Sequence, residues 1–149
     1  MDFEDKLIAL SKKCNEQKEK CYDNEAATKL SLINPFIRAL GYDTENLDEV
    51  SPEYNASIGE HKDARVDYAI LKDGKPIIII EAKAYGVALD AKKCSQLLLY
   101  FAGVNPEIGI LTDGVTYQFF SKEADSEKMD TRPYMVLNME KLKDIIIIK

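Results

Sequence analysis

One stretch, Pro76-Ile-Ile-Ile-Ile-Glu-Ala-Lys83, constrains the fold more than any other part of the chain. Four consecutive isoleucines are typical of a strand that is buried on both faces in the middle of a sheet. The run ends in Glu81 and Lys83, which are separated by one residue. Charged side chains are almost never fully buried unless they are paired or bind a metal. The stretch therefore predicts a central strand whose end carries a carboxylate and an ammonium for a purpose other than packing.

A second carboxylate lies in the preceding apolar run, Arg65-Val-Asp-Tyr-Ala-Ile70. Side chains alternate along a strand, so Glu81 and Lys83 share one face, and Asp67 is expected on the same face as Ala69. Two carboxylates from paired strands, with a lysine beside one of them, would form a site of hard oxygen ligands. Magnesium and manganese prefer such ligands.

The register of these two strands depends on the turn Lys72-Asp-Gly-Lys75. A two-residue turn would place Asp67 opposite Ile80, which is on the wrong face. A three-residue loop with a bulge would place Asp67 opposite Ile79 and leave Glu81 diagonal to it. Asp-Gly permits either turn, and the metal chemistry requires the second.

The other elements follow from changes in hydrophobic period. Apolar residues at helical spacing predict an amphipathic helix over about 2–21 and a second helix over 25–41. Pro35 lacks a backbone donor, so a kink is expected near Asn34. Further along, we expect strands over 45–54, 64–71, 76–83, 107–112, 115–120 and 134–137, a helix over 89–102 capped by Asp90 and closed by Gly103, and a helix or strand over 140–148. This order predicts a mixed α/β fold.

The chain has 149 residues, of which 46% are hydrophobic and 31% are charged, which fits a single globular domain over 1–149. No apolar stretch approaches the roughly 20 residues of a membrane span, and the N-terminus lacks the pattern of a signal peptide. We therefore expect a cytoplasmic protein without membrane contact. The three cysteines contain no Cys-x-x-Cys and predict reduced core thiols.

Several classes of function lack their signatures. No P-loop is present, and no Gly-x-Gly-x-x-Gly follows a strand, which excludes the common nucleotide motors and dinucleotide enzymes. The single histidine, His61, lies in a polar run without a recognisable Ser/His or Cys/His partner. With 20 basic and 26 acidic residues the net charge is -6, so any binding of nucleic acid must be local.

The motif residues resemble those of a known superfamily. Asp67, followed after thirteen residues by Glu81-Ala-Lys83, is similar to the core of the PD-(D/E)XK nucleases, with Val66 in place of their proline. Gln96-Leu-Leu-Leu-Tyr100 resembles the Gln-x-x-x-Tyr element of one subgroup. That subgroup includes the N-terminal nuclease domain of type I restriction enzyme R subunits, which segments around 32–43, 49–53 and 109–114 also resemble.

The resemblance implies a fold, a cofactor and a set of roles. The fold would be the three-layer restriction-endonuclease type, a central mixed sheet flanked by helices. Asp67, Glu81 and the helical Glu25 would bind Mg2+ or Mn2+, and Lys83 would orient or deprotonate the attacking water. The expected substrate contacts come from one helix and are made by Gln96, Tyr100 and Lys93.

The implied activity is metal-dependent endonuclease cleavage of DNA in a restriction or phage-defence system. The alternatives are a non-catalytic nucleic-acid-binding or assembly module, and a nuclease subunit that needs a partner. Other restriction or defence subunits and a homodimer are the protein partners considered. Simpler interpretations also exist for single residues, since Glu81 and Lys83 can form a strand-end ion pair, Glu25 favours a helix's first turn, and Tyr100 can be a core aromatic.

Overall fold

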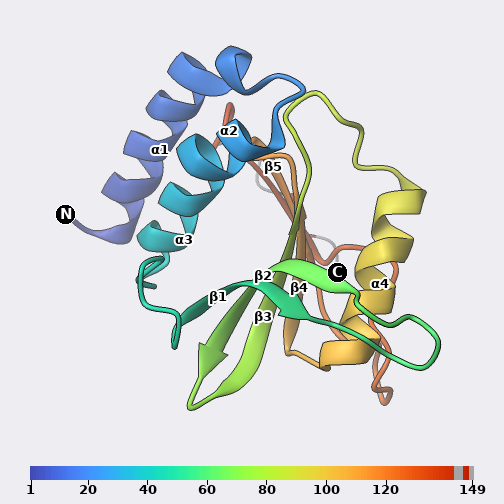
Figure 1. Cartoon of the computed structure of the whole chain (residues 1–149). Coiled ribbons are helices and arrows are strands. Elements are labelled where there is room, and N and C mark those ends of the chain that lie inside the picture. Colours follow the sequence, from blue (N-terminus) through green and yellow to red (C-terminus); the bar gives the residue numbers. More distant parts are fainter. Residues whose placement is uncertain (143–145, 148–149) are drawn as a thin grey trace.

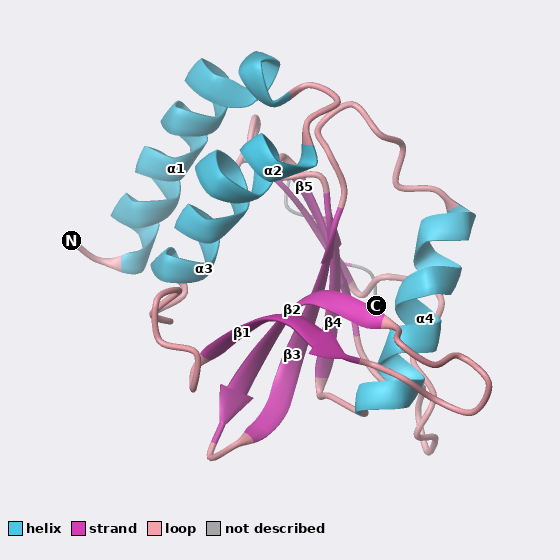
Figure 2. Cartoon of the chain, in the orientation of Figure 1, coloured by secondary structure: helices cyan, strands magenta, loops and turns pink. Residues whose placement is uncertain are grey.

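A seven-stranded sheet runs through the molecule, with helices on both of its faces (Figures 1 and 2). The structure is a computed structural model that describes residues 1–142 and the backbone of 146–147. The helices are α1 (Phe3–Gln17), α2 (Glu25–Thr28), α3 (Asn34–Ala39) and α4 (Ala91–Val104), with a 3-10 turn η1 (Lys18–Cys21) and a π-turn η2 (Lys29–Ile33). The strands are β1 (Val50–Asn55), β2 (Arg65–Lys72), β3 (Lys75–Ala82), β4 (Ile108–Thr112), β5 (Thr116–Phe120), β6 (Met135–Asn138) and β7 (Ile146–Ile147).

The strands lie in the sheet in the order in which they occur in the chain. Neighbours are antiparallel except β3 and β4, which are parallel because α4 carries the chain from one to the other. Figure 2 shows α1, α2 and α3 on one side of the sheet and α4 on the other. The predicted class, a mixed sheet flanked by helices in three layers, is therefore confirmed.

Two hydrophobic clusters fill the spaces on either side of the sheet. The larger one joins α1, η2 and α3 to the sheet through residues such as Phe36, whose ring stacks on Tyr117 with centroids 4.0 Å apart. The smaller one joins α4 to the sheet through Leu97 and Phe101. Two of the three free cysteines, Cys14 and Cys21, are buried in the larger cluster, and Cys94 is half-buried. None of the helices in the described part of the chain is long and apolar enough to cross a membrane.

The second predicted helix is not one continuous α-helix. It consists of α2, the π-turn η2 and α3, so the irregularity covers Lys29–Ile33 and ends just before Asn34, where the kink was expected. Pro35 lies in the first turn of α3, where a missing backbone donor costs least. The π-turn widens the helix at Lys29, which bears on the site described below.

Two predicted boundaries were wrong. The strand expected from residue 45 begins at Val50, because residues 43–49 fold into turns in which the Asn46 amide donates to the Asp43 carbonyl. Helix α4 does not close at Gly103 but continues to Val104 and is closed by Asn105, which takes the left-handed conformation at φ 57°. Gly103 instead permits close packing, since a Cβ there would lie 2.3 Å from the carbonyl oxygen of Ala56.

Neither predicted register of the β2–β3 hairpin is correct. The turn has two residues, Asp73 and Gly74, both left-handed at φ 53° and 76°, and it pairs Lys72 with Lys75. Such a turn matches the twist of the flanking strands. The pairing then shifts by one residue beside Pro76, which has no amide hydrogen to donate to the ladder. As a result Tyr68 pairs with Ile80, and the next position places Asp67 beside Glu81.

The end of the chain is described only in part. Residues 146–147 form a strand, β7, which pairs antiparallel with β6, so the strand alternative holds at that position. Residues 140–142 form neither helix nor strand, and residues 143–145 and 148 of the segment predicted over 140–148 lie outside the described residues.

Candidate active site

Strands β2 and β3 separate from each other at the position of the two motif carboxylates. Their ladder ends at Tyr68 and Ile80, although β2 continues against β1 and β3 continues against β4. In the gap, the amide of Ala82 donates to Asp67 Oδ2 at 2.8 Å, and the amide of Asp67 donates to Glu81 Oε1 at 3.4 Å. The two carboxylates thus take the place of backbone carbonyls, and this locks both side chains into the fork between the strands.

Glu81 is only 4% exposed, and its neighbours are charged. Burial raises the pKa of the Glu81 carboxyl, and the hydrogen bond and charge of Asp67 add to the effect, giving a value of about 8. The ammonium of Lys83, 3.3 Å from Glu81 Oε2, opposes this rise. A buried carboxylate next to another carboxylate is costly for the fold and is typical of a functional site.

Helix α4 supplies the second partner of Lys83. The ammonium of Lys83 donates to Gln96 Oε1 at 2.8 Å, so it is held between the end of β3 and the helix. Tyr100 lies one turn after Gln96, and burial together with the charges of Glu81 and Asp67 raises the pKa of its hydroxyl. Gln96 and Tyr100 therefore adjoin the carboxylates.

Lys93 lies one turn before Gln96 on the same helix face by its spacing. Its ammonium is 3.6 Å from the carboxylate of Asp90, which is the N-cap of α4. Lys93 thus borders the site without contacting its carboxylates.

The other oxygen of Asp67 contacts a lysine from the helical layer on the opposite side of the sheet. Lys29 Nζ lies 2.7 Å from Asp67 Oδ1, 3.3 Å from Glu25 Oε2 and 3.9 Å from Glu53 Oε1. Burial would lower the pKa of Lys29, but Asp67 and Glu25 outweigh it and raise the pKa. Glu25 therefore approaches the site, as expected from the sequence, but it reaches Asp67 through an ammonium.

The face predicted for Asp67 was wrong. The neighbours of Asp67 pack on opposite sides of the sheet, Val66 in the cluster under α4 and Tyr68 in the cluster under α3, so the strict alternation of β2 breaks at this point. Pairing with β3 has just ended there, although pairing with β1 continues on both sides of Asp67. The Asp67 side chain consequently points toward Lys29, on the side of α3. The Lys83 side chain points to the other side of the sheet, where it contacts α4. The carboxylates of Asp67 and Glu81 lie next to each other between the two strands.

Residues 24–139 match the family described as type I restriction enzyme R protein N terminus (HSDR_N). The chain belongs to this family. The match confirms the resemblance drawn from Asp67, from Glu81-Ala-Lys83 and from the Gln-x-x-x-Tyr helix. It begins at the cap of α2 and ends after β6, so it includes every residue of the site and excludes α1. No curated protein matches the chain.

Two residues of this R protein N-terminal domain were not assigned to the site from sequence. Glu53 falls within the strand expected over 45–54, and its side chain is 64% exposed, but its flanking pairs Pro52–Tyr68 and Tyr54–Val66 place it across from Asp67. Its backbone is left-handed at φ 51°, a strained conformation for glutamate. Lys29 had one signal, since it follows Glu25 by four residues, the spacing of a helical ion pair.

The donor set of this family member fits a hard divalent cation. The carboxylates of Asp67 and Glu81 are adjacent and poorly solvated. Their oxygens are the type of ligand that Mg2+ and Mn2+ prefer. Within the described residues, no three Asp, Glu, His or Cys side chains come together in a ready cation site. The ammonium of Lys29 lies among three of the carboxylates instead.

An open pocket of about 370 Å³ adjoins the site on the side of α3. Its polar lining consists of Lys29, Asn34, Thr44, Glu53, Asp67 and Tyr68. The Tyr68 hydroxyl donates to Asn34 Oδ1 at 2.8 Å, which fixes one wall. The carboxylates of Asp67 and Glu53 therefore face an opening to solvent, whereas buried Glu81 does not line the pocket.

Proposed function

We propose that this protein is a metal-dependent endonuclease that hydrolyses DNA phosphodiester bonds in a restriction or phage-defence system. The observation that carries the proposal is the fork between β2 and β3, where Asp67 and Glu81 are held side by side with Lys83 against Glu81. Two adjacent carboxylates, one of them buried, are costly for the fold beyond the two amides they accept, which favours a functional role. Membership of the R protein family supports the same activity.

Each residue of the site has a separate role in this proposal. Asp67, Glu81 and Glu25 would hold Mg2+ or Mn2+, which when bound neutralises charge on the phosphate and activates water. Lys83 positions the attacking water and offsets the charge that develops at phosphorus, because Gln96 and Glu81 fix the direction of its ammonium. Tyr100, Gln96 and Lys93 lie along one face of α4 and would contact the DNA backbone.

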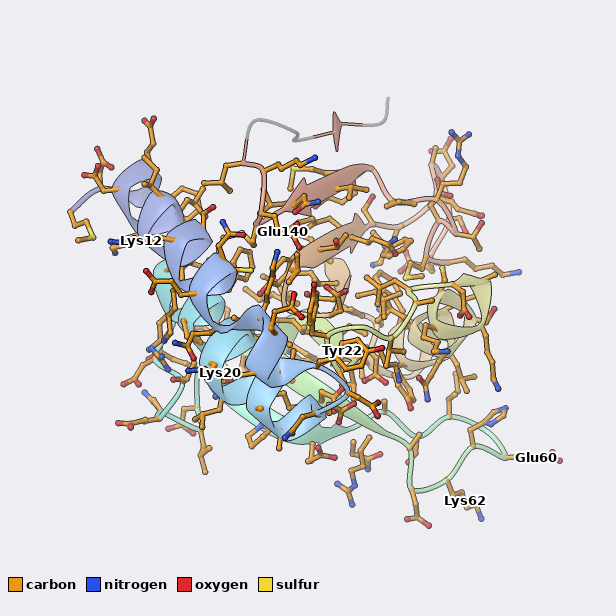
Figure 3. All side chains as sticks on the ribbon, turned by 90° about the horizontal axis from the view of Figure 1, so that it is seen from above. Lys12, Lys20, Tyr22, Glu60, Lys62 and Glu140 are labelled. Atoms are coloured by element: carbon orange, nitrogen blue, oxygen red, sulfur yellow. The ribbon has the colours of Figure 1, made fainter. Side chains whose placement is uncertain are left out.

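Basic residues outside the catalytic cluster would supply the remaining DNA contacts. Residues 56–64 form a loop between β1 and β2, and Figure 3 shows Lys62 and Glu60 near its outer end. Lys62 is exposed on this loop, and Lys92 is exposed on the first turn of α4. Both lysines would contact DNA phosphates. A chain with a net charge of -6 needs such local positive charge to bind DNA.

A second candidate is a nuclease subunit that cuts only with its restriction partners. The position of Lys29 favours it, because an ammonium in contact with Asp67 opposes metal binding in the isolated chain. The partners would be other subunits of a type I restriction system. A non-catalytic DNA-binding module is the third candidate, and the intact set Asp67, Glu81 and Lys83 speaks against it.

Incubation with supercoiled plasmid and with single-stranded DNA tests the proposal. The wild-type protein should cut DNA in the presence of Mg2+ or Mn2+ and should not cut it in EDTA. The Glu81→Ala variant should be inactive with either metal. Cleavage that appears only with added restriction subunits would support the second candidate. Binding of DNA without cleavage under every condition, or cleavage that persists in EDTA, would contradict the proposal.

A further inference from the structure

We infer that Lys29 is an internal counter-cation that competes with the divalent metal for Asp67. Its ammonium balances the carboxylates while no metal is bound, and it must leave Asp67 Oδ1 when a metal binds. The inference rests on the proposed function, because it concerns the metal site of that same activity. It assigns a regulatory position to a residue outside the nuclease motif.

The contacts of Lys29 place its charge at the centre of the cluster. The ammonium lies within 4 Å of carboxylate oxygens of Asp67, Glu25 and Glu53, at 2.7, 3.3 and 3.9 Å. The lysine side chain is 23% exposed and that of Asp67 only 13%, so water screens this pair less than a surface pair. A divalent cation bound among these carboxylates would take the place of the Lys29 ammonium.

Each oxygen of Asp67 already accepts one hydrogen bond, and the bond on Oδ1 comes from Lys29. Oδ2 accepts a hydrogen bond from the amide of Ala82 at 2.8 Å, and Oδ1 accepts from Lys29 at 2.7 Å. A metal binds a carboxylate oxygen at about 2.0–2.6 Å. Two cations on one oxygen would lie a few ångströms apart and repel each other strongly at low local dielectric. The present position of Lys29 therefore opposes metal binding at Oδ1.

The local structure allows the lysine to move. Lys29 is the first residue of the π-turn, and such turns occur often at functional sites. Its unbranched stem can rotate without shifting the helix, and it lines the open pocket of about 370 Å³, into which the ammonium can swing. Glu53, the third carboxylate around Lys29, has the strained backbone noted above, so two irregular backbone positions flank the same ammonium.

Replacing the ammonium by an apolar group of similar length tests the competition. Lys29→Met should bind Mn2+ at least about tenfold more tightly than wild type, measured by calorimetry and by the electron paramagnetic resonance of free Mn2+. The matched control is Lys18→Met, which removes a 3.0 Å ion pair with Glu140 outside the site and should leave Mn2+ affinity unchanged. Equal or weaker Mn2+ binding by Lys29→Met would overturn the inference.

A measurement on the wild-type chain does not depend on the folding of any variant. Brief treatment with an acetylating reagent, followed by peptide mass spectrometry, reports how accessible each lysine amine is. Adding Mg2+ should raise the acetylation of Lys29 relative to Lys18, because the displaced ammonium enters the pocket. Unchanged or lower acetylation of Lys29 with Mg2+ would contradict the displacement.

Failure of the inference can be told apart from failure of the proposed function. If Lys29→Met binds Mn2+ more tightly and neither protein cuts DNA, the competition stands and the nuclease proposal fails. If wild type cuts DNA in Mg2+ and Lys29→Met has unchanged Mn2+ affinity, the nuclease proposal stands and the competition is wrong.

Discussion

Glu81 is the residue at which the demands of folding and function conflict most clearly. It is 4% exposed, and burial and Asp67 raise the pKa of its carboxyl from 4.5 to about 8. Between these two pH values the folded state holds a proton that the unfolded state releases, so the free energy of unfolding falls as pH rises through this window. Below it, Glu81 is protonated in both states and the penalty is absent.

Glu81→Gln should therefore stabilise the metal-free protein. At pH 8 in EDTA, we expect the free energy of unfolding to rise by roughly 1–3 kcal/mol, because a neutral amide replaces a buried carboxylate. Urea denaturation of both proteins at pH 5 and pH 8 measures the effect, which should be smaller at pH 5. A variant less stable than wild type at pH 8 would mean that the charged carboxylate is satisfied without a metal.

The motif residues were recognisable from the sequence, whereas Lys29 and Glu53 were not placed in the site. Glu81 and Lys83 stand out because charges at the end of an isoleucine run have few explanations. Lys29 lies on a helix and Glu53 on the edge strand, both regions in which exposed charges are ordinary. Their meeting at Asp67 depends on how α2 packs over the fork, and no local pattern encodes that contact.

At the scale of elements, the contact between α4 and the loop after β1 makes an unusual demand on one glycine. A Cβ on Gly103 would lie 2.3 Å from the Ala56 carbonyl oxygen and 2.9 Å from its carbon. Alanine normally stabilises a helix interior relative to glycine by roughly 0.5–1 kcal/mol. Here the sign should reverse.

Gly103→Ala should lower the free energy of unfolding by roughly 1–3 kcal/mol, since backbone atoms must move apart to admit the methyl group. Urea denaturation measures this directly. Ala102→Gly on the neighbouring, exposed position of the same helix is the control for intrinsic helix propensity, and should cost only about 1 kcal/mol. A Gly103→Ala protein as stable as wild type would show that the two elements are not in close contact.

The hairpin illustrates why register was harder to predict than the existence of its strands. The alternation of β2 and the apolar run of β3 indicated both strands within a residue or two. The two-residue turn alone would place Asp67 opposite Ile80. A one-residue shift beside Pro76 places Asp67 beside Glu81 instead. Directly after the shift, β3 also pairs with β4, where Ile78 pairs with Ile108, thirty positions later in the chain. A contact of that range leaves no trace in the hairpin's own sequence.

At the scale of the whole molecule, the net charge of -6 sets how the chain can meet DNA. We expect weak binding that falls steeply with salt, as is typical when a few lysines contact phosphates. Lys92→Glu combined with Lys93→Glu should weaken binding, because these residues border the site on α4. The measurement is fluorescence anisotropy with a labelled duplex at two salt concentrations.

The control for that experiment is a second double variant with the same change in net charge. Lys12→Glu with Lys20→Glu alters two exposed lysines on α1 and η1, in the helical layer opposite α4; Figure 3 labels both residues. It should affect DNA binding less than the α4 pair. Equal losses in the two variants would mean that only the overall charge matters and that α4 does not face the substrate.

The central claim is that Asp67 and Glu81 hold a metal while Lys83 acts on the nucleophile, and one pair of measurements on Lys83→Ala tests it most directly. Calorimetry with Mn2+ should show that the variant retains metal binding or improves it, because a competing positive charge has been removed. A plasmid-nicking assay on the same protein should show a rate lower by about two orders of magnitude or more, on the order of 3 kcal/mol in barrier. A Lys83→Ala protein that cuts at the wild-type rate would contradict the account and leave Glu81 and Lys83 as an ion pair at a strand end.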